Sequence, residues 1–156
     1  LGRYLKPGVA NWIEIQVQVD RPEQGLLEPV RVVGDFVLDR HPNGPRLNAR
    51  RTLPGLGDWA GYGYPETSGW ATYRTTFVAT GEETELDLGL VYEVASVFLD
   101  DRLVAHLFKP PFCVSFPSLK QGLHHLRVEV ANGLGNLMKR LRNPVGLYGP
   151  VRMIMR

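Results

Sequence analysis

The sequence predicts an all-β protein built as an antiparallel β-sandwich or barrel. Apolar and polar residues alternate with a period of two in several segments, as in strands that bury one face. The 17 glycines and 12 prolines among 156 residues divide the chain into short segments separated by turns. No segment shows a long helical stripe with capping residues. Many short strands joined by turns are typical of a sandwich or barrel.

The first predicted strand spans residues 12–19. Apolar side chains at its odd-numbered positions share one face, and polar side chains at the even-numbered positions between them share the other. This pattern predicts one buried and one wet face. The inward residues are Ile13, Ile15, Val17 and Val19.

Later segments repeat this logic. Inward faces are predicted at Ala95, Val97 and Leu99, and at Leu126, Val128 and Val130. The pair Asp100-Asp101 predicts a tight hairpin turn, because short acidic side chains tolerate left-handed backbone. Residues 136–141 could form one or two helical turns before Pro144. Further strands are predicted at 30–38, 70–78, 84–90, 103–108 and 145–155.

Two segments of the chain are similar. Leu5-Lys6-Pro7-Gly8 leads into the apolar alternation of 13–17, and Leu119-Lys120-Gln121-Gly122 leads into that of 126–130. The similarity is either chance among β-sequences, or residues 1–20 are the closing strand of a preceding, similar domain. Residues 21–156 then form the sandwich and begin with a linker or loop, 21–25.

Charge and motifs exclude several function classes. A net charge of +2 gives no field that favours nucleic acid, and the short basic run Lys139-Arg140 with Arg142 is typical of a solvated surface. No apolar run is long enough to span a membrane. The lone Cys113 is predicted to be a buried hydrophobe. The nucleophile elbow, the phosphate loop and the helical zinc motif are all absent.

No catalytic or metal-ligating residue is predicted. His124 and His125 are adjacent on a predicted strand, so their side chains point to opposite faces and cannot share a metal. A glycosidase needs two acids about 5–9 Å apart. The neighbouring acids Glu82-Glu83 and Asp100-Asp101 instead fit turns on the surface.

The Gly-rich segment 53–70 is the candidate binding loop. It carries four large aromatic side chains, and rings on loops can stack on sugar rings while polar side chains bind the hydroxyls. The alternative is a lid, in which the rings fold back over one end of the sandwich. The predicted ligand-binding residues are Trp59, Tyr64 and Trp70 for stacking, with Asp58, Glu66, Arg74, Asn132 and Asn136 as polar partners.

Over residues 30–156 the sequence resembles the galactose-binding-like β-sandwich of bacterial glycoside hydrolases, of the family-2 and rhamnosidase types. One departure is the Asp100-Asp101 turn, where the family usually has Asn-Gly. Another is Ser115-Phe116-Pro117, where the family tends to place an acid and a hydroxyl. The segments that carry the resemblance are 33–38 (VGDFVL), 67–77 (TSGWATYRTTF), 86–89 (LDLG), 95–102 (ASVFLDDR), 109–112 (KPPF), 128–132 (VEVAN) and 143–151 (NPVGLYGPV).

The resemblance implies a jelly-roll accessory domain, itself non-catalytic, whose partners are a carbohydrate and the catalytic domain of its parent chain. It implies a periplasmic or secreted parent, although the sequence itself identifies no compartment. Related sandwiches often carry a structural calcium ion, but no dense acidic loop is present to hold one, and no cofactor is predicted. The alternatives are a purely structural interaction domain and, less favoured, an independent glycoside hydrolase.

Overall fold

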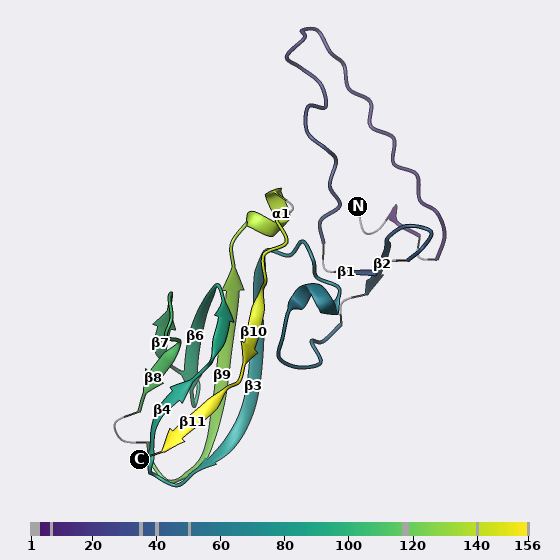
Figure 1. Cartoon of the computed structure of the whole chain (residues 1–156). Coiled ribbons are helices and arrows are strands. Elements are labelled where there is room, and N and C mark those ends of the chain that lie inside the picture. Colours follow the sequence, from purple (N-terminus) through teal and green to yellow (C-terminus); the bar gives the residue numbers. More distant parts are fainter. Residues whose placement is uncertain are drawn as a thin grey trace. The chain divides into compact units, whose positions relative to one another are not determined.

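The computed structural model describes residues 4–155 apart from 7, 35, 40, 50, 117–118 and 140. The chain divides into two compact units, Leu1–Gly34 and Asp35–Arg156. The second unit contains every strand of the described chain (Figure 1).

One layer of the second unit is a four-stranded antiparallel sheet with the order β3-β9-β6-β7. β3 and β9 pair over eleven residues each, and β6 lies on the other side of β9. β9 is therefore paired along both edges. The strands are β3 (Gly69–Ala79), β6 (Val94–Leu99), β7 (Arg102–Leu107) and β9 (Gly122–Asn132).

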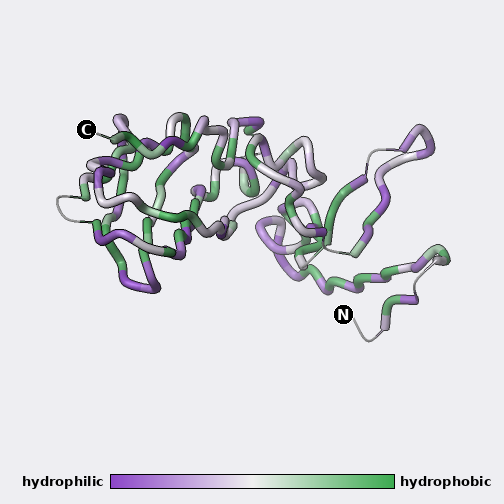
Figure 2. Tube along the Cα trace, turned by 90° about the horizontal axis from the view of Figure 1, so that it is seen from below, coloured by the Kyte–Doolittle hydropathy of each residue, from purple (hydrophilic) through white to green (hydrophobic). Residues whose placement is uncertain are grey.

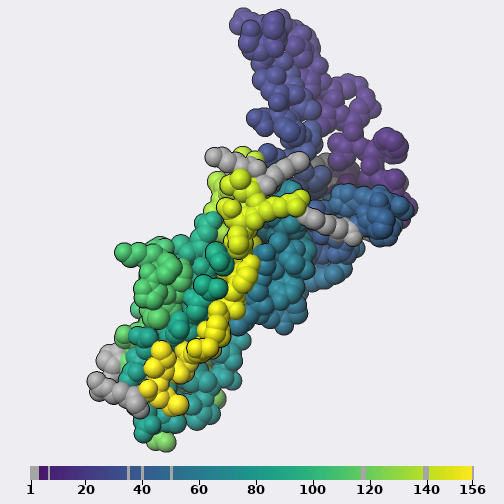
Figure 3. Space-filling view, in the orientation of Figure 1, coloured from purple at the N-terminus to yellow at the C-terminus, as the bar shows by residue number. Residues whose placement is uncertain are grey.

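The other layer consists of a three-stranded sheet, β11-β4-β8, and a two-stranded sheet, β10-β5. β10 and β11, the last two strands along the chain, form a continuous yellow strip in Figure 3. A bridge between Gly89 and Gly149 joins the chain where β4 passes into β5 and β10 into β11. A Cβ at Gly89 would lie 2.5 Å from the Gly149 oxygen, so only glycine allows this approach. The strands are β4 (Glu83–Asp87), β5 (Leu90–Tyr92), β8 (Cys113–Ser115), β10 (Gly146–Gly149) and β11 (Arg152–Met155).

The hydrophobic core consists of inward-facing side chains of both layers. On β9 burial follows the predicted alternation, because Leu126, Val128 and Val130 are buried while their neighbours are not. The second layer contributes Leu86, Leu88 and Leu147. The all-β antiparallel sandwich expected from the sequence is confirmed.

Three smaller elements complete the second unit. β1 (Phe36–Asp39) and β2 (Arg46–Ala49) form a two-stranded antiparallel ribbon. A 3₁₀ helix spans Trp59–Tyr62, and α1 spans Gly135–Lys139. These elements carry the loops in which the candidate site lies.

Most predicted strands are confirmed, and three predictions need correction. The segment 30–38 contains a strand only from Phe36, and 145–155 is divided into two strands. β2 and β8 are too short for a sequence alternation to reveal them. Residues 12–19 belong to no strand in the structure.

The hairpin turn at Asp100-Asp101 is confirmed. Both residues have positive φ values, 48° and 62°, between β6 and β7. Two successive left-handed residues match the twist of a two-residue hairpin.

The first unit contains two extended arms, residues 9–19 and 26–33. A turn closed by a hydrogen bond from the Gln24 amide to the Arg21 carbonyl, 3.0 Å, joins them. Every residue described between 4 and 34 is exposed.

Candidate functional site

The 53–70 loop is fixed to the sandwich through Trp59. Its ring is buried, and its indole nitrogen donates to the Tyr73 hydroxyl on β3, 2.8 Å away. Its backbone amide donates to the Val145 carbonyl at 3.0 Å. Trp59 therefore links the loop to β3 and to the residue that precedes β10.

Local capping shapes the 3₁₀ helix. Asp58 is the N-cap of this helix, and its carboxylate accepts a hydrogen bond from the Ala60 amide at 3.1 Å. Gly63, at φ 95°, closes the other end. Asp58 therefore caps the helix of its own loop. Burial, followed by the negative charge of Asp58, also raises the pKa of the Tyr148 hydroxyl to about 12.

The ribbon of β1 and β2 packs against this helix. The Leu38 amide donates to the Gly63 carbonyl at 2.9 Å, and Val37 is fully buried. A Cβ at Gly63 would lie 3.1 Å from the Cβ of Val37, so glycine permits the close packing. This contact places the end of β1 at the edge of the loop.

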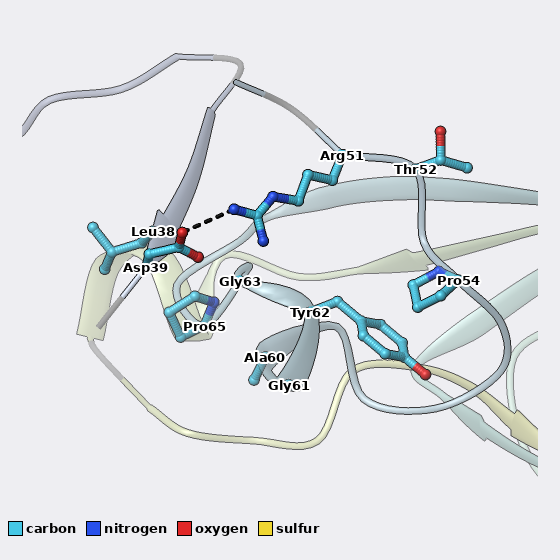
Figure 4. A pocket seen from close by; sticks show the side chains of 10 residues that line it. All are labelled: Leu38, Asp39, Arg51, Thr52, Pro54, Ala60, Gly61, Tyr62, Gly63 and Pro65. Carbon is cyan, nitrogen blue, oxygen red and sulfur yellow. Dashed lines mark hydrogen bonds and ion pairs between the residues drawn. The ribbon is translucent and has the colours of Figure 1, made fainter. Parts of the chain in front are cut away.

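Tyr64 fixes the chain that faces β1. Its hydroxyl donates to the Arg51 carbonyl at 2.7 Å and accepts from the Arg51 amide at 3.1 Å. With its backbone held at both polar atoms, Arg51 directs its guanidinium toward Asp39 (Figure 4).

These contacts form an open pocket of about 510 Å³, within the usual size of small-molecule sites. The Arg51 guanidinium and the Asp39 carboxylate form an ion pair at 2.8 Å, and Asn48 also donates to this carboxylate. Both charged side chains stay partly exposed, 58% and 38%. The lining residues are Leu38, Asp39, Arg51, Thr52, Pro54, Ala60, Gly61, Tyr62, Gly63 and Pro65.

The pocket combines donors, acceptors and an aromatic surface. The guanidinium is a planar donor, and the carboxylate accepts at both oxygens. The Tyr62 hydroxyl donates to the Leu56 carbonyl at 2.8 Å, which holds the ring in place. Asp39 is the only carboxylate among the described residues that line the pocket. The arrangement suits binding of a polar ligand.

The predicted stacking residues have different positions. Trp59 is only 2% exposed and belongs to the hydrophobic core. Tyr64 packs against the core and holds Arg51. Trp70 is 73% exposed. Ala71 and Tyr73, at the odd-numbered positions of β3, pack against the core, so Trp70, at an even-numbered position, lies on the outward face. The three rings therefore do not line one site.

Besides Asp58, two of the five predicted polar residues are structural clips, whose side chains hold loops in place. The Asn132 side chain accepts from the Gly69 amide at 3.0 Å and donates to the Thr67 carbonyl at 2.7 Å. The buried Asn136 side chain bonds both backbone polar atoms of Asn143, at 2.9 and 3.1 Å. Their amide groups are engaged in holding loops.

The other two predicted polar residues, Glu66 and Arg74, are exposed and do not line the pocket. Arg74 faces outward from β3, four residues after Trp70 and therefore on the same side of the strand. A ligand-binding role for Trp70, Glu66 and Arg74 stays a prediction.

The sequence indicated the loop but carried no signal for the charged pair. Pro54, Tyr62 and Pro65 of the predicted loop line the pocket, whereas Asp39 and Arg51 lie before it. Tyr62 is one of the loop's four aromatics, and this was the available signal. Asp39 and Arg51 carry no local pattern, because their pairing depends on the docking of the β1–β2 ribbon.

Among the described residues, Cys113 and the potential metal ligands form no second site. Burial, followed by the charges of Asp87 and Glu85, raises the pKa of the Cys113 thiol to about 11, so it stays protonated at neutral pH. Among the described residues no group of three His, Cys, Asp or Glu side chains could hold a metal ion. In the same part of the chain no helix is long and apolar enough to cross a membrane.

His124 forms a hydrogen-bonded ion pair with Asp100 in the β6–β7 turn. Its Nδ1 lies 2.7 Å from an Asp100 carboxylate oxygen, and its Nε2 lies 2.8 Å from the Lys120 carbonyl. Both partners are acceptors, so both contacts are hydrogen bonds only when the imidazole is protonated. These bonds, the one to Lys120 first, raise the pKa of His124. The His125 amide, followed by His124, lowers the pKa of Asp100.

Stability is therefore expected to depend on pH. The His124 contribution is fully present below its ordinary pKa of 6.5 and is lost as pH rises through the raised folded value. The Asp100 contribution is present above 3.8 and is lost as pH falls through the lowered value. Because Asp100 is 45% exposed, the loss above pH 6.5 should be at most about 1 kcal/mol. Urea unfolding at pH 6 and 9 checks this. A His124→Gln variant should show a smaller decrease, and an equal decrease would contradict the assignment.

The fold is similar to parts of known enzymes. The structure matches a rhamnosidase from Novosphingobium sp. PP1Y with a TM-score of 0.55 and 24% identity, over 86% of this chain and 16% of that one. Weaker matches are a GH2 beta-galacturonidase from Eisenbergiella tayi (TM-score 0.44, 25% identity, 63% and 18% covered) and a beta-glucuronidase from Bifidobacterium dentium (0.38, 21%, 59% and 16%).

Of these three matches, the rhamnosidase match has a TM-score above 0.5, and at 24% identity it supports the fold alone. This chain spans about one sixth of that enzyme's length. No protein-family model matches the sequence, and no curated protein matches it significantly. The chain thus has the fold of one small part of a much larger enzyme.

Proposed function

We propose that this chain is a non-catalytic, jelly-roll accessory domain of a larger glycoside hydrolase and that its pocket binds part of a carbohydrate. The fold likeness to 16% of a rhamnosidase supports the accessory role. The catalytic domain of the parent would then be its neighbour in the same polypeptide.

The Asp39–Arg51 pair in the pocket is the observation that carries the proposal. Neighbouring sugar hydroxyls both donate and accept, and a carboxylate beside a guanidinium offers both functions within 2.8 Å. Tyr62 adds an aromatic ring to the lining, on which an apolar sugar face can pack. The ion pair neutralises the site, so it suits an uncharged saccharide.

A purely structural domain is the second candidate. The burial of Trp59 and the clip formed by Asn136 favour it, because the loop then closes one end of the sandwich without needing a ligand. On this alternative the pocket would bind no saccharide.

Replacing Arg51 with alanine is expected to weaken saccharide binding at least tenfold. The variant removes charged hydrogen bonds, each worth roughly 1.5–3 kcal/mol. The measurement is ligand-observed NMR or calorimetry with a panel of mono- and oligosaccharides. Arg74→Ala is the matched control, since Arg74 is an exposed arginine that does not line the pocket.

The outcomes separate the candidates. Loss in Arg51→Ala with binding intact in Arg74→Ala supports the pocket. The reverse would keep carbohydrate binding but move it to the outward face of β3. An absence of binding to every saccharide would favour the structural domain.

A further inference from the structure

The first arm carries an apolar face that no other described residue of the first unit covers. Ile13, Ile15, Val17 and Val19 alternate with polar residues, and each is 48–52% exposed. Figure 2 shows this alternation of hydrophobic and hydrophilic residues along the extended segment near the N-terminus. Isolated apolar residues on a surface are ordinary, but a regular row of them at strand spacing marks a face built for burial.

The structure of the similar segment shows what such a face becomes when it is covered. The apolar alternation that follows Leu119–Gly122 belongs to β9, which is paired along both edges. Its inward residues Leu126, Val128 and Val130 are 6%, 3% and 0% exposed. Leu119, before the turn, is buried as well, whereas its counterpart Leu5 is 38% exposed. The two segments thus share a sequence pattern but differ in burial at each apolar position.

We propose that residues 8–19 are the β9 counterpart of a second, preceding β-sandwich in the same polypeptide. The inward row would be covered by the facing sheet of that domain, and neighbouring strands would pair with both edges of the arm. Glu14, Gln16 and Gln18 would lie on the outward face, like the half-buried Arg127 and Glu129 of β9.

The fold comparison supports this occupant. The rhamnosidase match covers 86% of the chain, more than Asp35–Arg156 alone can supply, so the likeness extends into the first unit. That enzyme is also several times longer than this chain, so it has room for further domains. The proposal does not depend on saccharide binding by the pocket.

Hydrogen exchange on the natural polypeptide, including the residues encoded before Leu1, tests the proposal against the 156-residue chain. Amides 12–19 should exchange at least about 100-fold more slowly in the longer polypeptide, because they are bonded there and exposed here. Fast exchange in both would overturn the proposal. Slow exchange in the 156-residue chain, with the mass of a dimer, would show a second copy as the occupant. A natural polypeptide with no residues before Leu1 would also overturn it.

Matched substitutions test which face is buried. Val17→Asp should lower the unfolding midpoint of the longer polypeptide, whereas Gln16→Asp should leave it unchanged. In the 156-residue chain both should be silent, while Val130→Asp, at the equivalent position of β9, should destabilise it. Equal effects of Val17→Asp and Gln16→Asp in the longer polypeptide would contradict the assigned face. Saccharide binding should be intact in both arm variants, so failure here is distinct from failure of the pocket.

Discussion

Trp59→Ala is expected to lower the free energy of unfolding by about 3–5 kcal/mol, the usual cost of removing a large buried ring. The ring is 2% exposed, and its loss leaves a cavity and removes the bond to the Tyr73 hydroxyl. Both Tyr73 on β3 and the segment at Val145, which precedes β10, contact Trp59 and would be affected. Urea unfolding followed by circular dichroism measures the change.

Trp70→Ala is the matched control for this prediction. It removes the same side chain from a site that is 73% exposed, so the change in stability should stay within about 0.5 kcal/mol. A Trp59→Ala variant with native stability but no saccharide binding would contradict the structural role. It would return Trp59 to the ligand site.

Gly146→Ala is the second change with a large expected effect. Gly146 has a φ of 122°, and a Cβ there would meet the Gly57 carbonyl oxygen and lie 2.7 Å from the indole nitrogen of Trp59. Backbone strain and overpacking each cost about 1–3 kcal/mol, so we expect a loss of about 3–5 kcal/mol. The midpoint of thermal unfolding measures it.

Gly55→Ala controls for the loss of a loop glycine. No atom lies within 4 Å of a Cβ built at Gly55, and its φ lies outside the left-handed region. Its stability should change by less than about 0.5 kcal/mol. If Gly146→Ala is recovered only as insoluble protein while Gly55→Ala is soluble, the clash is supported. Equal midpoints for Gly146→Ala and the unaltered chain would show that the close approach is not required.

Much of the sandwich could be predicted from the sequence because strand periodicity is local. The inward row of β9 and the Asp100-Asp101 turn depend on residues close together in the chain, so their pattern is visible without a fold. The segment 12–19, by contrast, belongs to no strand. It has the same alternation, yet a strand also needs a paired edge, and the described chain supplies none.

The candidate site depends on long-range packing as well as on local sequence pattern. The sequence indicated the aromatic loop, and that loop does line the pocket through Pro54, Tyr62 and Pro65. It could not separate Trp59 from Trp70, because the same residue type in the same loop is buried in one case and exposed in the other. Trp70 is exposed because it lies at a position of β3 whose side chain points outward. Trp59 is buried because it packs between the layers.

The sequence by itself determined the all-β class, most of the strands and the loop in which a pocket forms, since each follows from local alternation and turn chemistry. Only the tertiary structure decided which side chains meet. Asp39 and Arg51 approach to 2.8 Å because Val37 packs on Gly63 and Tyr64 holds the Arg51 backbone. Such contacts join segments that carry no common local pattern, so they exist only once the sheets have packed.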